Sequence, residues 1–453
     1  MKQILGVFFI VSIFFSCKKG QEIRTTLSAQ QQWILDSMQV YYYWSETLPR
    51  NPVASTSTLA FFKSILNTED RFSTITNPKE QSTRYSSFAW YGFEYAVLQK
   101  KELSDDLIGV ITLVVPNGPA AKKGLKRGDV FTKVNNLPIQ PSNIEGIKSL
   151  LEEGNGVSLA ISKLENNQLK PVGDVQLSYT RFAEQPAYTT RIFEDNGHKT
   201  GYLFYNRFNG NYDYNILDSL RKLRDAAVNN LIIDMRYNPG GDISSVAKIA
   251  AVIANVNAQQ VFAIYQANRN GGKQFRSFQD AISENRYQPQ DFNELLARRF
   301  SLSKVYVLTT GATASAAELL INTLRPFVEV VHVGEKTLGK DMASFAIEDL
   351  RKPKIIDLTL YPLIFKLYNA NGEGNYAKGL TPNFTVNELS ELPLWQIGEA
   401  GDPLIKKALT LIGHVATGKN IMNTTSSLER NVVYYNSSVE NSLTTAPMSI
   451  KRR

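Results

Sequence analysis

The chain has 453 residues, 43% hydrophobic and 20% charged, a composition that supports folded cores and a length that predicts about two to four domains. Its single cysteine excludes an internal disulfide framework and any zinc or iron–sulfur site that needs several cysteines. Three dispersed histidines argue against a histidine-built metal site, and a net charge of +8 spread along the chain favours solubility over nucleic-acid binding.

The N-terminus has the pattern of a secretory signal over residues 1–16. Lys2 precedes an apolar run from Ile4 to Phe15, which is too short to span a bilayer as a helix. Phe14-Phe15-Ser16-Cys17 resembles the lipobox of bacterial lipoproteins, with Phe where Leu is usual. The resemblance implies lipid on Cys17 and an anchor in the bacterial cell envelope, expected at the outer membrane and facing the periplasm or the cell surface. A cleaved signal with a free Cys17 is the alternative, and no later segment predicts a transmembrane helix.

Two helices are expected after a polar tether over residues 17–27. Apolar residues recur at helical spacing within residues 28–49 and again from Ser57 to Leu66. We expect both helices to form a small N-terminal helical unit over residues 28–86. The aromatic run from Tyr41 to Trp44 also fits a carbohydrate-stacking surface, although a helix–helix core is the simpler account.

Residues 87–182 read as one domain of short strands separated by Gly and Pro turns. The expected elements are two helices, a short one from Ala120 to Gly124 and one from Ile144 to Leu151. Three strands are also expected: Leu107 to Val115, Val130 to Val134 and Val157 to Lys163. Their order resembles a PDZ domain, and the motifs that carry the resemblance are Gly118-Pro119-Ala120-Ala121, Gly124-Leu125-Lys126-Arg127-Gly128-Asp129-Val130 and Val134-Asn135-Asn136.

The PDZ resemblance implies a peptide-binding loop formed by Tyr91, Gly92 and Phe93. In such a domain a peptide adds a strand to an exposed sheet edge, and backbone N–H groups capture its terminal carboxylate. Glu94 lies beside this loop and would repel a carboxylate unless its side chain points away.

Strands and helices alternate through residues 183–412, which predicts an α/β domain with a largely parallel sheet. The expected strands are Gly201 to Phe208, Asn230 to Met235, Val305 to Thr309 and Val328 to Val333. After Ile412 the chain becomes polar and loses clear periodicity, so residues 413–453 are expected to form a polar, flexible tail.

Three loops that follow strands carry residues suited to chemistry. The first ends in Gly240 and Gly241, whose backbone N–H groups could hold an oxyanion, although a structural turn explains the pair equally well. The second places Ser315 near a helix N-terminus, where its hydroxyl could react or merely cap the helix. The third contains Lys336 and Lys340. A lysine in a dry pocket has a lowered pKa and could deprotonate a serine, but most lysines are solvated surface charges.

Together the three loops resemble those of the tail-specific or carboxyl-terminal processing proteases, S41-type serine peptidases with a PDZ domain and a Ser–Lys dyad. The resemblance covers residues 27–412 and includes the 25-residue separation of Ser315 and Lys340. It implies a multidomain α/β protein with a crotonase-like peptidase core that needs no cofactor or metal. It also assigns the site residues: Ser315 as nucleophile, Lys340 rather than Lys336 as general base, Ala316 with Gly240 or Gly241 as oxyanion donors, and Glu318 in support.

Two residues depart from the family pattern. Family members often place Gln four residues after the lysine, and this position is Ser344, which can still form a hydrogen bond. Asp341 would raise the lysine pKa if it pointed inward. The sequence thus predicts an envelope-anchored serine endopeptidase that cleaves proteins or peptides. The alternative is a weakly active or inactive peptidase-fold lipoprotein that binds polypeptides.

Overall fold

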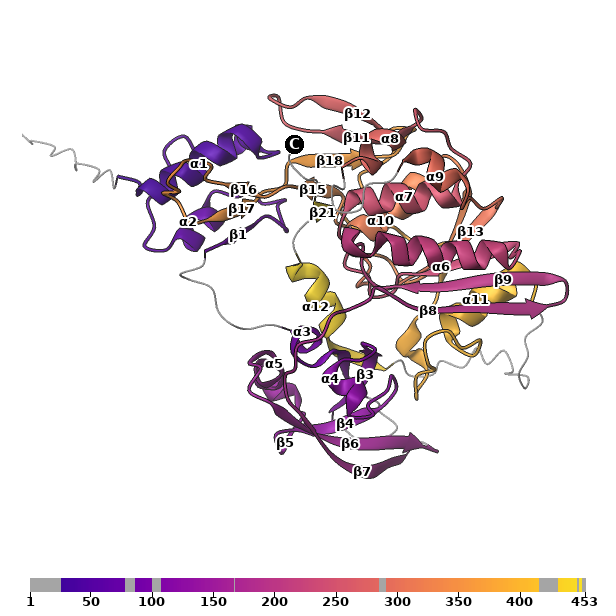
Figure 1. Cartoon of the computed structure of the whole chain (residues 1–453). Helices are drawn as coiled ribbons and strands as arrows, with labels where there is room; N and C mark the ends of the chain where they lie inside the picture. Colours follow the sequence, from indigo (N-terminus) through magenta and orange to yellow (C-terminus); the bar gives the residue numbers. More distant parts are fainter. Residues whose placement is uncertain are drawn as a thin grey trace, which may run out of the picture.

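The computed structural model describes residues 26–77, 86–99, 107–166, 168–284, 291–414, 431–445 and 448–449. Three bodies are visible in Figure 1: a small N-terminal unit, a lower body built around one sheet, and a larger α/β domain. They correspond in order to the helical, PDZ-like and peptidase-like regions expected from the sequence.

The N-terminal unit packs two capped helices against two short strands of the α/β domain. Its elements are α1 (Ala29–Tyr41), η1 (Ser45–Thr47), α2 (Thr58–Ser64) and β1 (Thr74–Thr76). Ser28 and Ser57 accept hydrogen bonds at the two helix N-termini, as capping requires. β1 forms a three-stranded sheet with β17 (Thr359–Tyr361) and β16 (Ile347–Glu348). The unit therefore shares its core with the α/β domain instead of standing apart.

The PDZ-like body is a strongly bent antiparallel sheet with short helices at its edges. Its chain order is α3 (Ser87–Tyr91), β2 (Phe93–Gln99), β3 (Leu107–Val114), α4 (Pro119–Lys122), β4 (Val130–Val134), β5 (Leu137–Pro138), η2 (Pro141–Asn143), α5 (Ile144–Glu152), β6 (Val157–Glu165) and β7 (Gln168–Leu177). Asn135 and Asn136 both have positive φ, which makes the tight hairpin turn that their sequence predicts.

The α/β domain has a six-stranded sheet in the order β19-β14-β13-β10-β9-β8, parallel except for β8. The strands are β8 (Ala187–Asp195), β9 (His198–Tyr205), β10 (Asn230–Asp234), β13 (Lys304–Thr309), β14 (Glu329–Gly334) and β19 (Phe384–Thr385). Alternate strand residues face two different cores. One core contains α6 (Asp213–Asp225), α7 (Ile243–Ile253) and α10 (Ala316–Leu324), and the other contains α11 (Pro403–Ile412). Both faces of the sheet are thus covered, as a parallel sheet requires.

A second sheet of the α/β domain has the order β12-β11-β18-β15-β21. Its strands are β11 (Val261–Gln266), β12 (Lys273–Ser277), β15 (Met342–Ser344), β18 (Phe365–Tyr368) and β21 (Met448–Ser449). The remaining short elements are η3 (Gly210–Tyr212), α8 (Phe278–Ile282), α9 (Phe292–Leu296) and η4 (Glu388–Ser390).

The C-terminal region differs from the tail without regular structure that its composition predicts. It contains β20 (Val432–Asn436) and α12 (Ser437–Thr444) before β21. β20 is the edge strand of the PDZ-like sheet, next to β2, and β21 pairs with β15. Figure 1 shows α12 between the lower body and the α/β domain. These strands form because partners distant in sequence supply their hydrogen bonds, which local polarity does not reveal.

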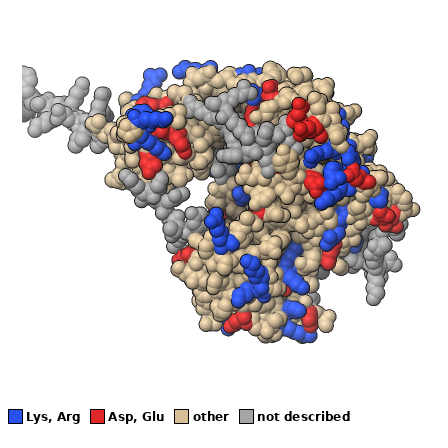
Figure 2. Space-filling model, viewed as in Figure 1, with Lys and Arg blue, Asp and Glu red and all other residues tan. Residues whose placement is uncertain are grey.

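Charge is mixed over the surface that Figure 2 displays, where basic and acidic side chains lie among one another. Within the described ranges, no helix is both long enough and apolar enough to cross a membrane.

Candidate active site

Ser315 lies in the turn that joins β13 to α10, in a backbone conformation that is rare for any residue but glycine. Its φ is 62° and its ψ is −118°. Such a conformation costs about 1–3 kcal/mol and is typical of residues held in place for a function. A strained residue between a strand and a helix presents its side chain at the end of the sheet. The turn is held by Ala314, whose N–H donates to the Asn238 carbonyl over 2.9 Å.

The paired glycines lie directly beside this serine. A Cβ on Gly240 would come within 2.5 Å of Ser315 Cβ and 2.9 Å of Ala316 N, so only glycine fits there. Gly241 is equally constrained, because a Cβ would meet the Phe208 carbonyl oxygen at 1.8 Å. The Gly240 N–H donates to Asn238 Oδ1 over 2.8 Å. The structure thus brings the first two sequence-predicted loops together around Ser315.

Glu318 fastens the serine loop to the lysine loop. One carboxylate oxygen accepts hydrogen bonds from Ser315 N (2.8 Å) and Lys340 N (2.7 Å). The other accepts from Gly339 N (2.8 Å) and from the Thr337 hydroxyl. Glu318 is fully buried, and this burial raises the pKa of its carboxyl to about 7. A single side chain therefore fixes the relative position of the two backbones.

Lys340 is enclosed, whereas Lys336 is exposed to solvent. Lys340 Nζ lies 4.8 Å from the centroid of the Phe72 ring, which belongs to the N-terminal unit. Burial lowers the pKa of Lys340 to about 7, Glu318 opposes this shift, and Arg71 adds to it. An ammonium that loses water without full compensation becomes a base near neutral pH.

Asp341 and Ser344, the two residues that depart from the family pattern, contact groups other than the Lys340 ammonium. The Asp341 carboxylate lies 3.6 Å from Lys366 Nζ, and the Ser344 hydroxyl donates to the Phe345 carbonyl over 3.4 Å. Lys340 Nζ instead donates to two carbonyls of the C-terminal region, Ser442 O at 2.9 Å and Thr445 O at 2.6 Å.

The Ser315 hydroxyl also contacts the C-terminal region. Its Oγ accepts a hydrogen bond from the backbone N–H of Met448 over 3.0 Å. Ser315 is fully buried, and Lys340 is 1% exposed. Sequence reasoning missed these contacts, because nothing in a polar Asn-, Ser- and Thr-rich stretch indicates that it lies over a site.

His332 lies on β14. Its Nε2 is 2.6 Å from the Thr309 hydroxyl, and burial lowers its pKa to about 4, so the ring is neutral at physiological pH. The described residues hold no cluster of His, Cys, Asp or Glu that could bind a metal ion.

The PDZ-like loop has the conformation expected of a tight turn before a strand. Tyr91 ends α3, Gly92 has a φ of 73°, and Phe93 begins β2. Glu94 is buried and binds Ser437 and Asn441 of the C-terminal region. Cys17, the expected lipidation site, lies outside the described residues.

A buried charge network that the sequence did not reveal links the PDZ-like body to the glycine loop. Arg236 pairs with Asp234 and Asp402 at 2.7 Å each, and with Glu388 at 3.1 Å. Arg127 of the PDZ-like body reaches the same Glu388 at 2.9 Å. Arg127, Arg236, Glu388 and Asp402 are far apart in sequence, so only the fold shows that they meet.

Comparison with known proteins identifies the architecture. The profile of peptidase family S41 matches residues 199–386, that of the S41 N-terminal domain matches residues 29–74, and a PDZ profile matches residues 110–161. The two S41 profiles together cover just over half of the chain. The chain belongs to peptidase family S41. The family resemblance and the fold class expected from the sequence are thereby confirmed.

Relatives and a solved structure agree with this membership. The S41 chain is 26% identical over 245 residues to a carboxyl-terminal-processing protease of Picosynechococcus, covering 54% of this chain and 53% of the relative. It is 28% identical over 287 residues to the carboxy-terminal processing protease CtpB of Bacillus subtilis, covering 62% and 53%. It spans about half the length of these curated relatives. A Bacteroides fragilis crystal structure, described as a candidate S41 protease, covers 84% of this chain and 96% of its own, with a TM-score of 0.68 and 27% identity.

Proposed function

We propose that this S41 chain is a serine endopeptidase that cleaves protein or peptide substrates with Ser315 as nucleophile and Lys340 as general base. The observation that carries the proposal is the buried Lys340, whose pKa is lowered to about 7 and whose backbone is joined to that of Ser315 through Glu318. Family membership and the names of the relatives support a peptidase.

The chemistry begins with proton transfer. Neutral Lys340 takes the proton from Ser315 Oγ, and the oxygen attacks the carbonyl carbon of a substrate peptide bond. The N–H of Ala316 and an N–H of the Gly240–Gly241 pair stabilise the oxyanion. Protonated Lys340 returns the proton to the leaving amine, and an acyl-enzyme forms on Ser315. Water then hydrolyses the acyl-enzyme, with Lys340 again accepting a proton.

The pKa of Lys340 gives this mechanism a pH dependence. The base works only when neutral, so activity should rise with pH through an apparent pKa near 7. An ordinary solvated lysine would place this rise near its usual pKa of about 10.4. Because Glu318 titrates in the same range and lies between the same loops, the measured value belongs to the pair.

Substitutions test the dyad directly. Ser315→Ala and Lys340→Ala should each abolish cleavage of an unfolded protein substrate, while Lys336→Ala should retain it because that side chain is exposed. Initial rates measured from about pH 5 to about pH 9 report the apparent pKa. If Lys340→Ala keeps the parental rate and pH profile, Lys340 is not the base.

We further propose that the PDZ domain recognises the C-terminus of the substrate or gates access to the site. A PDZ domain in a peptidase supports a polypeptide partner. The alternative function, a polypeptide-binding lipoprotein with little or no catalysis, would show as tight peptide binding without turnover.

Membrane attachment is the third part of the proposal. We propose that Cys17 carries lipid and anchors the protein in the bacterial envelope. Two observations support it: the lipobox-like sequence and the apolar run before it. Cys17→Ser should end incorporation of labelled fatty acid and release the protein from the membrane fraction. Equal labelling of the parent and Cys17→Ser would exclude this site.

A further inference from the structure

The described residues of the C-terminal region, 431–445 and 448–449, lie against both functional surfaces of the molecule. It first lies along the PDZ-like sheet as β20, continues as α12, and then lies along the second sheet of the α/β domain as β21. Figure 1 shows this yellow segment between the two bodies. One chain segment thus bridges the place expected for peptide binding and the place expected for catalysis.

β20 occupies the sheet edge at which a PDZ domain takes its peptide. It runs antiparallel to β2, with Val432 opposite Gln99 and Asn436 opposite Ala96, so it advances toward the loop that begins β2. Addition of an antiparallel strand to this edge is the way in which PDZ domains hold peptides. The chain's own segment therefore takes the position of a bound peptide.

Glu94 makes this edge better suited to a segment within a chain than to a chain end that carries a terminal carboxylate. A terminal carboxylate placed here would face a buried carboxyl group. Instead, Glu94 bonds the Ser437 hydroxyl, and it accepts a hydrogen bond of 3.0 Å from the Asn441 amide. Ser437 Oγ also accepts from Tyr95 N over 2.8 Å. The polar side chains satisfy the acid, and the chain continues past it toward the α/β domain.

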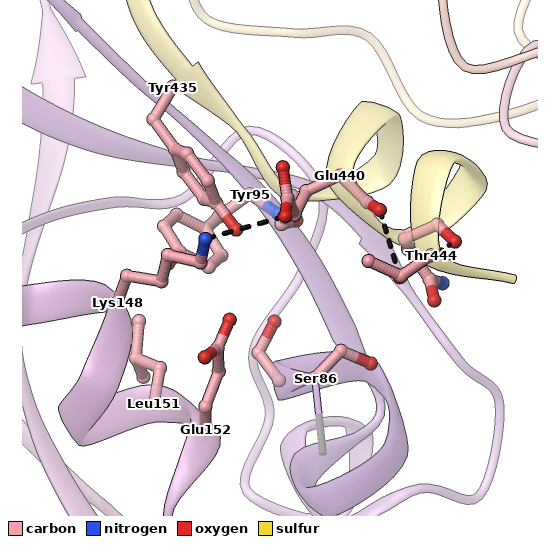
Figure 3. Close-up of a pocket in the computed structure, with 11 residues that line it drawn as sticks. Ser86, Tyr95, Lys148, Leu151, Glu152, Tyr435, Glu440 and Thr444 are labelled. Atoms are coloured by element: carbon pink, nitrogen blue, oxygen red, sulfur yellow. Dashed lines mark hydrogen bonds and ion pairs between the residues drawn. The ribbon is translucent and has the colours of Figure 1, made fainter. Parts of the chain in front are cut away.

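A pocket of about 230 Å³ lies between this segment and the PDZ-like helix α5. Figure 3 shows Lys148 of α5 and Glu440 of α12 pointing toward each other across it, at a separation of 3.4 Å. Tyr435 lies against Tyr95 with ring centroids 5.4 Å apart. Side chains of both partners therefore line the groove, as in a peptide complex.

At the other end of the path, the segment engages both members of the dyad. Met448 donates its N–H to Ser315 Oγ, and Lys340 Nζ donates to the carbonyls of Ser442 and Thr445. Met448 is fully buried beside β15, in parallel register with Ala343. A protein substrate cannot reach a serine that is covered in this way.

The Met448 contact differs from that of a peptide bond about to be cleaved. The N–H of Met448 lies in the plane of its peptide group, so an oxygen that accepts a hydrogen bond from it lies close to that plane. Attack on a carbonyl carbon comes from outside that plane. The hydrogen bond therefore engages Ser315 Oγ without placing it for attack on the carbonyl carbon of that peptide group.

We propose that residues 431–445 and 448–449 act as an intramolecular pseudosubstrate, which fills the PDZ peptide edge and covers Ser315 and Lys340 until an extended internal segment of a protein substrate displaces it from the edges of β2 and β15. This inference rests on the proposed peptidase function for its biological meaning, but occupancy of the two edges is measurable without catalysis.

The test compares two aspartate substitutions within this segment of the full-length protein carrying Cys17→Ser. Met448→Asp puts a charge into a fully buried position, whereas Leu443→Asp puts the same charge at a position that is 37% exposed. The first measurement is binding of a fluorescent peptide with the sequence of residues 431–449. The second is the rate at which a fluorophosphonate labels Ser315. Ser437→Ala/Asn441→Ala serves as a second release variant, since it removes only hydrogen bonds to the PDZ-like sheet.

Met448→Asp should bind the peptide, and react with the fluorophosphonate, at least about tenfold better than the parent. The reason is that loss of the buried methionine side chain lowers the equilibrium constant for closing the segment by more than about tenfold. Ser437→Ala/Asn441→Ala should shift both readouts in the same direction, and Leu443→Asp should match the parent. Equal values for all four proteins would overturn the inference. Improved peptide binding without any turnover would retain the inference and remove the peptidase proposal.

Discussion

The shared carboxylate of Glu318 allows a sharp test of how the two loops cooperate. In Glu318→Gln the amide keeps one acceptor oxygen and turns the other into a donor. Whichever way it turns, two donors lose their acceptor: either Ser315 N and Lys340 N, or Gly339 N and the Thr337 hydroxyl. An unsatisfied buried group costs about 1–3 kcal/mol. We therefore expect a melting temperature lower by several degrees, at about 2–4 °C per kcal/mol.

The same substitution should change the pH profile in a defined direction. Burial lowers the pKa of Lys340, and the negative charge of Glu318 raises it again. Removing that charge leaves the lowering effect of burial unopposed, so more Lys340 is neutral at a given pH. The acid limb of kcat/KM should therefore move below its parental position near pH 7, even though the maximal rate falls because the loops are less well fixed.

Glu329→Gln provides a matched control. Glu329 is an exposed carboxylate at the start of β14, 3.1 Å from Lys304, and its loss should leave both the melting temperature and the pH profile unchanged. A structural role alone would lower stability in Glu318→Gln without moving the limb. An acid limb that stays in place or moves to higher pH in Glu318→Gln would refute the electrostatic reasoning.

Two further substitutions probe the surroundings of the site. Gly240→Ala would force a Cβ to within 2.5 Å of Ser315 Cβ, so kcat should fall on the order of a hundredfold, whereas Gly146→Ala, which meets open space in α5, should leave kcat unchanged. Comparable rates for the two variants would contradict the close approach. Arg127→Met removes one buried cation from Glu388 and should cost about 3 kcal/mol in the free energy of unfolding by denaturant, part of which Arg127→Met/Glu388→Gln should recover. A strictly additive double mutant would show that the pair does not interact.

Regular periodicity made much of the fold readable from the sequence. The strand expected from Asn230 to Met235 is β10, and the helix expected from Ile144 to Leu151 is α5. Long apolar runs and helical stripes are local signals, because their hydrogen bonds or buried faces repeat within a few residues. The helix expected over residues 28–49 is shorter, since α1 ends at Tyr41 and a 3-10 turn follows.

The parts that sequence reasoning did not reach depend on distant partners. β20 is short and lies in an otherwise polar region. Its residues from Val432 to Tyr435 are β-branched or aromatic and favour a strand, but nothing in them indicates that the strand pairs with β2. The buried ion network likewise joins Arg127, Arg236 and Glu388, which no spacing rule connects. The three chemically suited loops were found because each follows a strand, and parallel strands bring their carboxyl ends to one edge. What covers that edge could be learned only from the fold.

Phe72 of the N-terminal unit contacts the lysine that we propose as the general base of the α/β domain. This ring lies against Lys340 Nζ, and the neighbouring Arg71 also lowers the pKa of that lysine. β1 begins two residues after Phe72 and pairs with β17 of the α/β domain. The proton affinity of the lysine is therefore set partly by a segment of chain that leads back to the expected lipid anchor. Loosening of this strand pairing would admit water to Lys340, raise its pKa toward that of a solvated lysine, and leave less of it neutral at physiological pH.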